Sequence, residues 1–159
     1  MPLRVGQGFD FHPLRAGRPL KLGGVAIAHE FGLEGHSDAD VAAHALANAI
    51  LGALGQGDLG QHFPDTDARY KNADSLVLLA EVWKLAHDGG WRLVNADVTI
   101  FAQRPRLAPY VDAMRERLGG ALGAPPASVN VKASSPEGLG ALGRGEGMSA
   151  AAIVLLENT

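Results

Sequence analysis

Asp10 and His12 are the first residues in the chain whose types and spacing could do chemistry. They alternate with Phe9 and Phe11, as the residues of a half-buried strand do, and residues two apart on a strand point to the same face. A carboxylate and an imidazole on one face can bind the same divalent ion, and together they make two of the three protein ligands of a catalytic zinc site. The alternative for an isolated Asp-x-His is a strand whose polar face meets solvent. A third ligand from elsewhere in the chain has to decide between these interpretations.

His44 is the candidate for that third ligand. Asp40, His44 and Asn48 are spaced i, i+4, i+8, so they share one face of a predicted helix. The alternative is a surface histidine on a polar stripe. With Asp10 and His12, His44 would complete a set of three ligands and leave the fourth zinc position open for substrate or water, as in catalytic zinc sites.

A strand and a helix must bring these side chains together. A strand is predicted over residues 3–14, a glycine–glycine hairpin over 20–28 and a loop over 31–37. A helix is predicted from residue 38 to about 54, because Ser37 and Asp40 have the spacing of a capping box. The side chains on its buried side are small, so the helix should lie close against a sheet. The residues of that side are Val41, Ala42, Ala45, Leu46, Ala49, Ile50 and Ala53.

The rest of the chain is expected to add two helices and three strands. The helices are predicted over residues 74–88 and about 107–118. The first of them shows only a core-facing pattern, with no candidate site residue. The strands are predicted over residues 91–102, 129–133 and about 148–157, with Val94, Ala96, Val98 and Ile100 on one side of the first strand.

The loop over residues 57–67 could contact a polyol or a phosphate. It is rich in acids and turn formers, and Asp58, Asp65 and Asp67 are its candidates. Each of them could equally be a turn residue on a polar surface.

The glycine-rich loop over residues 134–147 is a second candidate. Its G-x-G-x-x-G spacing, which begins at Gly138, matches a dinucleotide fingerprint, but too few residues follow for the required βαβ unit. We reject that function. Two interpretations remain: a backbone that approaches a phosphate or hydrated Mg²⁺ with help from serine and glutamate side chains, or a turn without a ligand.

Composition narrows the function classes. The 159 residues suit one domain, 47% are hydrophobic and 19% are charged, as in globular proteins. There is no cysteine, so a metal would have to bind histidine and carboxylate ligands. The net charge of −3 argues against a nucleic-acid partner. We recognise neither a signal peptide nor a membrane span, and we expect a cytoplasmic protein.

Seven blocks, in order and spacing from about residue 4 to 157, resemble the family of 2-C-methyl-D-erythritol 2,4-cyclodiphosphate synthases. The blocks are Gly6–His12, His36–His44, Gly57–Gly60, Phe63–Asp67, Asp97–Gln103, Val129–Ala133 and Gly143–Gly147. The resemblance implies a single α+β domain over residues 1–159, a sheet backed by helices on one face. It also implies a homotrimer with each active site between two neighbouring chains. The implied reaction belongs to the non-mevalonate isoprenoid pathway: a lyase converts 4-diphosphocytidyl-2-C-methyl-D-erythritol 2-phosphate to the 2,4-cyclodiphosphate and CMP.

The resemblance also implies roles for individual residues. Asp10, His12 and His44 would hold Zn²⁺ or another divalent metal. Glu137 would help to hold Mg²⁺ or Mn²⁺ on the substrate diphosphate, and His36 and Ser135 would support the transition state. The implied substrate-binding residues are Asp10, His12, His36, Ser37, Asp58, Leu59, Gly60, Phe63, Pro64, Asp65, Thr66, Asp67, Ala102, Gln103, Arg104, Pro105, Arg106, Leu107, Ala108, Ala133, Ser134, Ser135, Pro136, Glu137 and Arg144.

Two positions depart from the family pattern. Pro136 stands in a run that is commonly rich in threonine, and it removes a backbone N–H from the loop. Ala141 stands where the family often has a phenylalanine that lines a cavity on the trimer axis. That cavity could take an isoprenoid diphosphate, with Arg144 as a possible contact.

The chemistry fits the residues, because an intramolecular attack by the 2-phosphate needs no side-chain nucleophile. Two alternatives remain open at this point. A metal-dependent phosphoesterase would use the open metal position to activate water. A trimeric binding protein for prenyl or nucleotide ligands would hold a structural metal and release no CMP.

Overall fold

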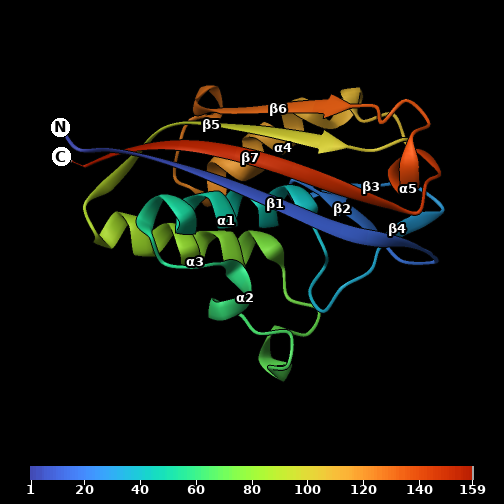
Figure 1. Cartoon of the computed structure of the whole chain (residues 1–159), viewed down its shortest axis with the longest axis horizontal. Coiled ribbons are helices and arrows are strands. Elements are labelled where there is room, and N and C mark those ends of the chain that lie inside the picture. The colour runs from blue at the N-terminus through green and yellow to red at the C-terminus, as the bar shows by residue number, and fades with distance from the viewer. Residues whose placement is uncertain (159) are drawn as a thin grey trace.

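The structure is a computed structural model that describes residues 1–158 (Figure 1). A five-stranded mixed sheet has the order β4-β1-β7-β5-β6, in which only the β5–β6 pair is parallel. A separate antiparallel hairpin, β2–β3, turns at two glycines as predicted. The strands are β1 (Leu3–Ala16), β2 (Leu20–Leu22), β3 (Val25–Ile27), β4 (Phe31–Leu33), β5 (Trp91–Phe101), β6 (Val129–Ser134) and β7 (Gly147–Asn158).

The main helices lie against the sheet. Helix α1 contacts β1 and β7 on one side and α3 on the other, while α4 contacts β6 (Figure 1). This agrees with the predicted α+β class. The helices are α1 (Val41–Leu54), α2 (Leu59–His62), α3 (Ser75–Asp88), α4 (Val111–Ala121) and α5 (Gly140–Gly143), with short 3-10 helices η1 (Ala68–Tyr70), η2 (Ala108–Tyr110) and η3 (Pro126–Ser128). Within residues 1–158, no helix is both long and apolar enough to cross a membrane.

Helix α1 lies directly on strand β1 because two glycines leave room for it. A Cβ atom on Gly6 would lie 1.9 Å from the carbonyl oxygen of Ala49, and one on Gly8 would lie 2.1 Å from that of Ala45. Gly6, Gly8 and Asp10 share one face of β1, so the face that meets α1 also carries the first candidate ligand. The close approach therefore determines how near a side chain of α1 can come to Asp10.

The alternation predicted for β1 is present, but its two faces are occupied in an unexpected way. Phe9 is 55% exposed and Phe11 is 66% exposed, whereas Asp10 and His12 are partly buried. The polar face of the strand points inward and the aromatic face points outward. The interpretation of Asp10 and His12 as a solvent-facing polar pair is therefore wrong.

Helix α1 begins at Val41, three residues later than predicted, and Asp40 rather than Ser37 is its N-cap. The Asp40 carboxylate is fully buried and accepts the backbone N–H groups of Gly23, Gly24 and Ala43 at 2.8, 2.7 and 3.1 Å. Burial raises the pKa of Asp40, although the three N–H groups oppose this change. Asp40 thus ties the β2–β3 turn to the helix and does not share an exposed face with His44. The predicted buried side of α1 and its end at Gly55 are confirmed.

Other boundaries differ from the prediction for local reasons. A register shift between Leu93 and Asn95 in β5 leaves Val94 39% exposed, so the prediction that Val94 shares one side of the strand with the buried Ala96, Val98 and Ile100 is wrong. The predicted loop over 31–37 contains strand β4, and α4 begins only after η2.

Strands β1 and β7 pair along almost their whole length, from Leu3 opposite Glu157 to Pro13 opposite Gly147. The backbone N–H of Asn158 donates to the carbonyl oxygen of Pro2 at 3.0 Å. The two ends of the described chain therefore lie side by side (Figure 1).

Candidate metal centre and substrate cavity

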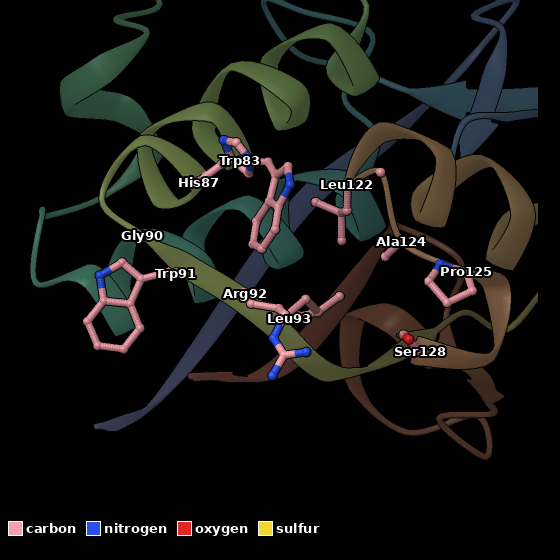
Figure 2. Close-up of a pocket in the computed structure, with 11 residues that line it drawn as sticks. Trp83, His87, Gly90, Trp91, Arg92, Leu93, Leu122, Ala124, Pro125 and Ser128 are labelled. Atoms are coloured by element: carbon pink, nitrogen blue, oxygen red, sulfur yellow. The ribbon is translucent and has the colours of Figure 1, made fainter. Parts of the chain in front are cut away.

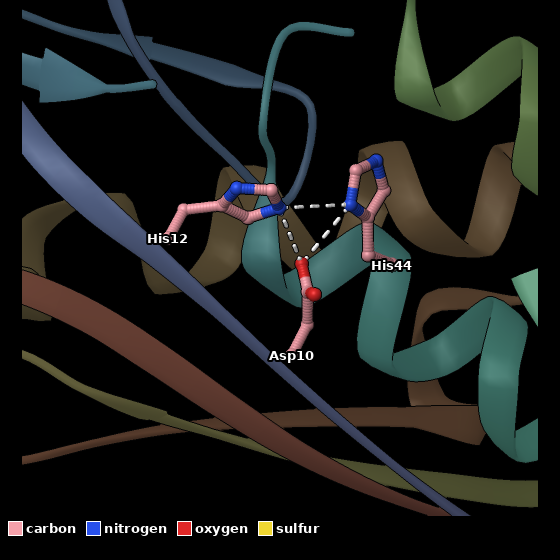
Figure 3. A group of neighbouring side chains, drawn as sticks. All are labelled: Asp10, His12 and His44. Atoms are coloured by element: carbon pink, nitrogen blue, oxygen red, sulfur yellow. Dashed lines mark hydrogen bonds and ion pairs between the residues drawn. The ribbon is translucent and has the colours of Figure 1, made fainter. Parts of the chain in front are cut away.

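Asp10, His12 and His44 converge on one point, as Figure 3 shows. Oδ2 of Asp10 lies 3.0 Å from Nε2 of His12 and 3.0 Å from Nδ1 of His44. The two histidine nitrogens are 3.4 Å apart. Strand β1 supplies the first two side chains and α1 supplies the third. The structure thus brings together the three predicted metal ligands.

The spacing of these donor atoms suits a tetrahedral ion. Nitrogen and oxygen ligands at about 2.0–2.1 Å from zinc are about 3.3 Å apart when the coordination is tetrahedral. The observed separations of 3.0, 3.0 and 3.4 Å are close to that value. Two imidazoles and a carboxylate are also a donor set that binds divalent transition metals well. The residues present therefore fit a divalent ion with an open fourth position.

Each histidine is held by a group on the far side of its ring. Nδ1 of His12 lies 2.9 Å from the carbonyl oxygen of Glu34, which can only accept, so Nδ1 donates and Nε2 is left to face Asp10. Nε2 of His44 contacts the hydroxyls of Ser37 and Ser75 at 3.1 and 2.8 Å. Such outer contacts orient histidine ligands in metal sites.

The cluster shifts the pKa of its own members. Burial by itself would raise the pKa of Asp10, but hydrogen bonds from His12 and His44 outweigh it and lower that pKa overall. Burial would likewise lower the pKa of His12, but the hydrogen bond and the charge of Asp10 raise it. The electrostatics therefore favour an ionised carboxylate between the two imidazoles.

The cluster opens into a cavity of about 510 Å³. Most residues predicted from the blocks at 36–44 and 57–67 line this cavity, so one space adjoins both the metal ligands and the polar loop. The lining residues are Asp10, His12, Gly35, His36, Ser37, His44, Asn48, Leu59, Gly60, Phe63, Pro64, Asp65, Tyr70 and Leu78.

Three predicted contacts in the same loop, Asp58, Thr66 and Asp67, do not line the cavity. Asp58 caps α2 by accepting the N–H of Gln61 at 3.0 Å. Asp67 caps η1 and pairs with Arg69 at 2.7 Å, and these hydrogen bonds lower the pKa of Asp67. The backbone carbonyl of Asp67 accepts a hydrogen bond from His36 Nε2 at 2.9 Å, so Asp67 holds a residue that does line the cavity.

The predicted residues at 102–108 and 133–137 lie apart from the cluster in the single chain, because none of them lines the 510 Å³ cavity. Gln103, Arg104 and Arg144 line a different cavity of about 320 Å³. Backbone N–H groups tie the glycine-rich loop together: that of Glu137 donates to Ser135 Oγ at 3.0 Å and that of Gly138 to Gln103 at 2.9 Å.

Several residues at the site were not predicted from the sequence. Asn48 lines the cavity and accepts the N–H of Leu59 at 2.8 Å, which its i+4 spacing from His44 could have indicated. Ser75, on the helix interpreted only as core, contacts His44 directly. No local pattern points to that contact, because it depends on how α3 packs on α1.

A larger cavity of about 680 Å³ lies elsewhere, between the ends of α3 and α4 and the start of β5. Figure 2 shows Trp83, Leu93 and Leu122 around it, with the side chain of Trp91 directed away. Arg92 at its edge is already paired with Glu157 at 2.5 Å. None of the predicted site residues lines it, so size alone does not identify the chemical site.

Comparisons with known proteins agree with the geometry. The sequence pattern of the YgbB family matches residues 3–157. The chain is 60% identical over 156 residues to a 2-C-methyl-D-erythritol 2,4-cyclodiphosphate synthase of Geobacillus kaustophilus, covering 98% of this chain and 99% of that protein.

Solved structures are also similar to this chain. The bifunctional IspDF of Campylobacter jejuni superimposes with a TM-score of 0.95 at 42% identity, over 99% of this chain but only 43% of that longer chain. A 2C-methyl-D-erythritol-2,4-cyclodiphosphate synthase in a form bound to CDP superimposes with a TM-score of 0.89 at 38% identity, over 97% of this chain and 100% of that one.

Proposed function

This chain belongs to the YgbB family of 2-C-methyl-D-erythritol 2,4-cyclodiphosphate synthases, and from that membership we propose that Asp10, His12 and His44 hold the metal ion of the reaction. The reaction forms the cyclic diphosphate of methylerythritol and releases CMP, in the non-mevalonate route to isoprenoids. The observation that carries the proposal is the convergence of three donor atoms, 3.0 to 3.4 Å apart, at the wall of a cavity.

The protein's task is to bend one molecule so that its 2-phosphate meets the phosphorus of its own diphosphate. Orienting two reacting groups can contribute up to about 7–11 kcal/mol to lowering the barrier. A bound divalent ion would supply a Lewis acid that neutralises phosphate charge. The protein needs such local positive charge, because its own net charge is −3.

The polar loop and His36 are proposed to hold the methylerythritol part of the substrate. Residues 59, 60 and 63–65 line the cavity beside the cluster. His36 donates from Nε2 to the carbonyl of Asp67, so the ring has a defined direction at the cavity wall. The cavity volume of about 510 Å³ is in the range of small-molecule sites.

The active form is proposed to be a homotrimer with shared sites. Val5, Phe9, Phe11 and Ile153 are 53% to 69% exposed on the sheet face away from α1, and a contiguous apolar face of this kind is a common place for subunit contact. The predicted nucleotide residues do not line the cavity of the metal cluster in one chain. A neighbouring chain that covers the apolar face could supply them.

The neighbouring chain is proposed to bind the cytidine diphosphate part of the substrate. Residues 102–108 and 133–134 would contact the cytidine, Ser135 would support the transition state and Glu137 would help to hold Mg²⁺ or Mn²⁺. A related synthase has been solved bound to CDP, which supports nucleotide binding. An isoprenoid diphosphate site near Arg144 and the cytoplasmic location stay predictions.

The test combines metal content with product analysis. Purified protein should carry one divalent ion per chain and convert the cytidylyl substrate to the cyclic diphosphate plus CMP. A linear phosphate product would indicate hydrolysis instead. His12→Ala should lose both metal and CMP release, whereas His87→Ala, which changes a histidine with a 76% exposed side chain outside the cavity, should lose neither.

A further inference from the structure

The ring of His44 is held from behind by a buried serine that belongs to another helix. Ser75 is the first residue of α3 and is only 1% exposed. Its hydroxyl oxygen lies 2.8 Å from Nε2 of His44, the ring nitrogen that points away from Asp10. Ser75 does not line the 510 Å³ cavity, so its hydroxyl contacts the metal ligand His44 and not the space for the substrate.

The direction of this hydrogen bond follows from counting donors. The Ser75 hydroxyl has one hydrogen, and it donates that hydrogen to Oδ1 of Asp38 in a short hydrogen bond. A carboxylate can only accept. Ser75 Oγ must therefore accept from His44, so Nε2 of His44 carries a proton and Nδ1 is the nitrogen left for a metal.

Asp38 is itself fixed in place. Its carboxylate accepts the backbone N–H of Ser75 at 3.1 Å and that of Asp40 at 3.2 Å. Nζ of Lys21 lies 3.6 Å from it and 3.5 Å from Asp74, the N-cap of α3. The positive end of α3 also favours a negative charge at this position. The chain of contacts thus runs from Lys21 through Asp38 and Ser75 to His44.

We propose that Ser75 and Asp38 are positioning residues for the metal centre. They hold the His44 imidazole with Nε2 protonated and Nδ1 directed at Asp10 and His12, and the negative charge of Asp38 makes the ring a stronger ligand. The inference rests on the proposed metal site. Loss of outer partners of this kind typically costs about 10- to 100-fold in metal affinity.

Ser37 has a different role in this arrangement. Its hydroxyl lies 3.1 Å from the same nitrogen, and it also accepts the N–H of Ala39 at 3.2 Å and lines the cavity. Unlike Ser75, which donates to Asp38, Ser37 has no hydrogen bond to a carboxylate among residues 1–158. Ser37 therefore contacts both His44 and the substrate cavity, whereas Ser75 contacts His44 and does not line that cavity.

The experiment measures the zinc dissociation constant by competition with a chromophoric chelator. Ser75→Ala should weaken zinc binding by about 10- to 100-fold. Ser75→Thr, which keeps the hydroxyl, should restore it. Asp38→Asn should give a smaller loss in the same direction, because the amide oxygen still accepts from Ser75 but carries no charge. Asp74→Ala is the matched control, since it removes the cap of α3 without touching His44, and it should bind zinc like the unmodified chain.

A second readout separates positioning from a general loss of structure. In the zinc-loaded enzyme, the Nε2 proton of His44 should give an NMR signal protected from exchange with water, and Ser75→Ala should lose that protection. Because Asp38→Asn leaves Ser75 in place, it keeps the proposal testable if Ser75→Ala does not fold.

The outcomes are distinct. Unchanged zinc affinity in both Ser75→Ala and Asp38→Asn would overturn the inference while leaving the metal site intact. An equal loss in Asp74→Ala would show that only the start of α3 matters, which also overturns it. If the unmodified chain binds no divalent ion, the proposed metal site fails and the inference fails with it.

Discussion

Oδ2 of Asp10 lies 3.0 Å from Nδ1 of His44, although the two residues are 34 positions apart in the chain. The contact exists because Gly6 and Gly8 of β1 pack directly against Ala45 and Ala49 of α1. Small residues at the strand–helix contact therefore decide whether the donor atoms of two elements can share one ion.

Removing a metal ligand should abolish turnover without unfolding the protein. His44→Ala should lower CMP release by more than the about 10- to 100-fold expected for an outer partner, because it deletes a direct ligand. It should also lose the bound ion, measured by metal analysis. His87→Ala, on the exposed end of α3, is the matched control. Retained turnover in His44→Ala would refute the ligand assignment.

Zinc binding should weaken as the pH falls, starting at a higher pH than for an ordinary histidine. Burial alone would lower the pKa of His12, but Asp10 raises it above 6.5 in the metal-free protein. Zinc needs the neutral ring, so protons compete with it once the pH falls to the raised pKa.

The pKa of His12 can be measured directly. An NMR titration of the metal-free protein should give a midpoint above 6.5 for this ring, and Asp10→Asn should move the midpoint down. Because the pKa of His12 is higher in the folded protein than in the unfolded chain, the ion pair with Asp10 also stabilises the metal-free fold. That stabilisation is fully present below pH 6.5 and is lost as the pH rises through the raised pKa. A midpoint at or below 6.5 would contradict this.

Adding one methyl group under α1 should disturb both the fold and the metal centre. Gly8→Ala places a Cβ 2.1 Å from Ala45 O and 2.6 Å from Ala49 N, so α1 has to move. We expect a loss of at least about 1–3 kcal/mol in the free energy of unfolding, together with weaker zinc binding. Gly120→Ala, where nothing lies within 4 Å, is the control and should be neutral or gain up to about 1 kcal/mol. Denaturant unfolding measures the free energy of unfolding of both variants. An equal change in Gly8→Ala and Gly120→Ala would argue against the close approach of α1 to β1.

Asp40, the buried N-cap of α1, should contribute more to the stability of the fold than Asp74, the half-exposed N-cap of α3. Asp40→Ala leaves three N–H groups without their acceptor, at about 1–3 kcal/mol for each buried group. Asp74→Ala removes one N–H contact, to Leu76 at 2.9 Å, from a side chain that is 45% exposed, so about 1 kcal/mol is expected. Thermal unfolding compares the two variants. A smaller effect for Asp40→Ala would contradict the role assigned to its buried hydrogen bonds.

Shared active sites should allow two inactive variants to rescue each other. His12→Ala lacks a ligand at the metal cluster and Glu137→Ala lacks the proposed loop carboxylate. In mixed trimers refolded from equal amounts, roughly a quarter of the interfaces combine an intact cluster with an intact loop from the neighbour. CMP release should then reappear at about that fraction. If the mixture stays inactive although light scattering shows trimers, then the site is not shared in the proposed way.

The sequence alone predicts elements well where one local signal decides them. The capped helix α3, the glycine–glycine hairpin and the end of α1 at Gly55 follow from such signals. Asp10, His12 and His44 could be grouped because strand and helix periodicities each place a ligand on a defined face.

What the sequence could not predict depends on tertiary contacts. Asp40 became a buried cap because the β2–β3 turn offers it two further N–H groups, and no spacing along the chain encodes that. Val94 faces outward because of a register shift in β5. Ser75 joins the metal centre only through the packing of α3 on α1.

The pairing of β1 with β7 has a consequence for engineering. Since Pro2 and Asn158 are already hydrogen-bonded neighbours, a short linker should close the polypeptide into a ring without moving either strand. New ends could then be opened at an exposed turn such as Gly123, which has open space around it. A circularly permuted chain of this kind should still assemble the three ligands.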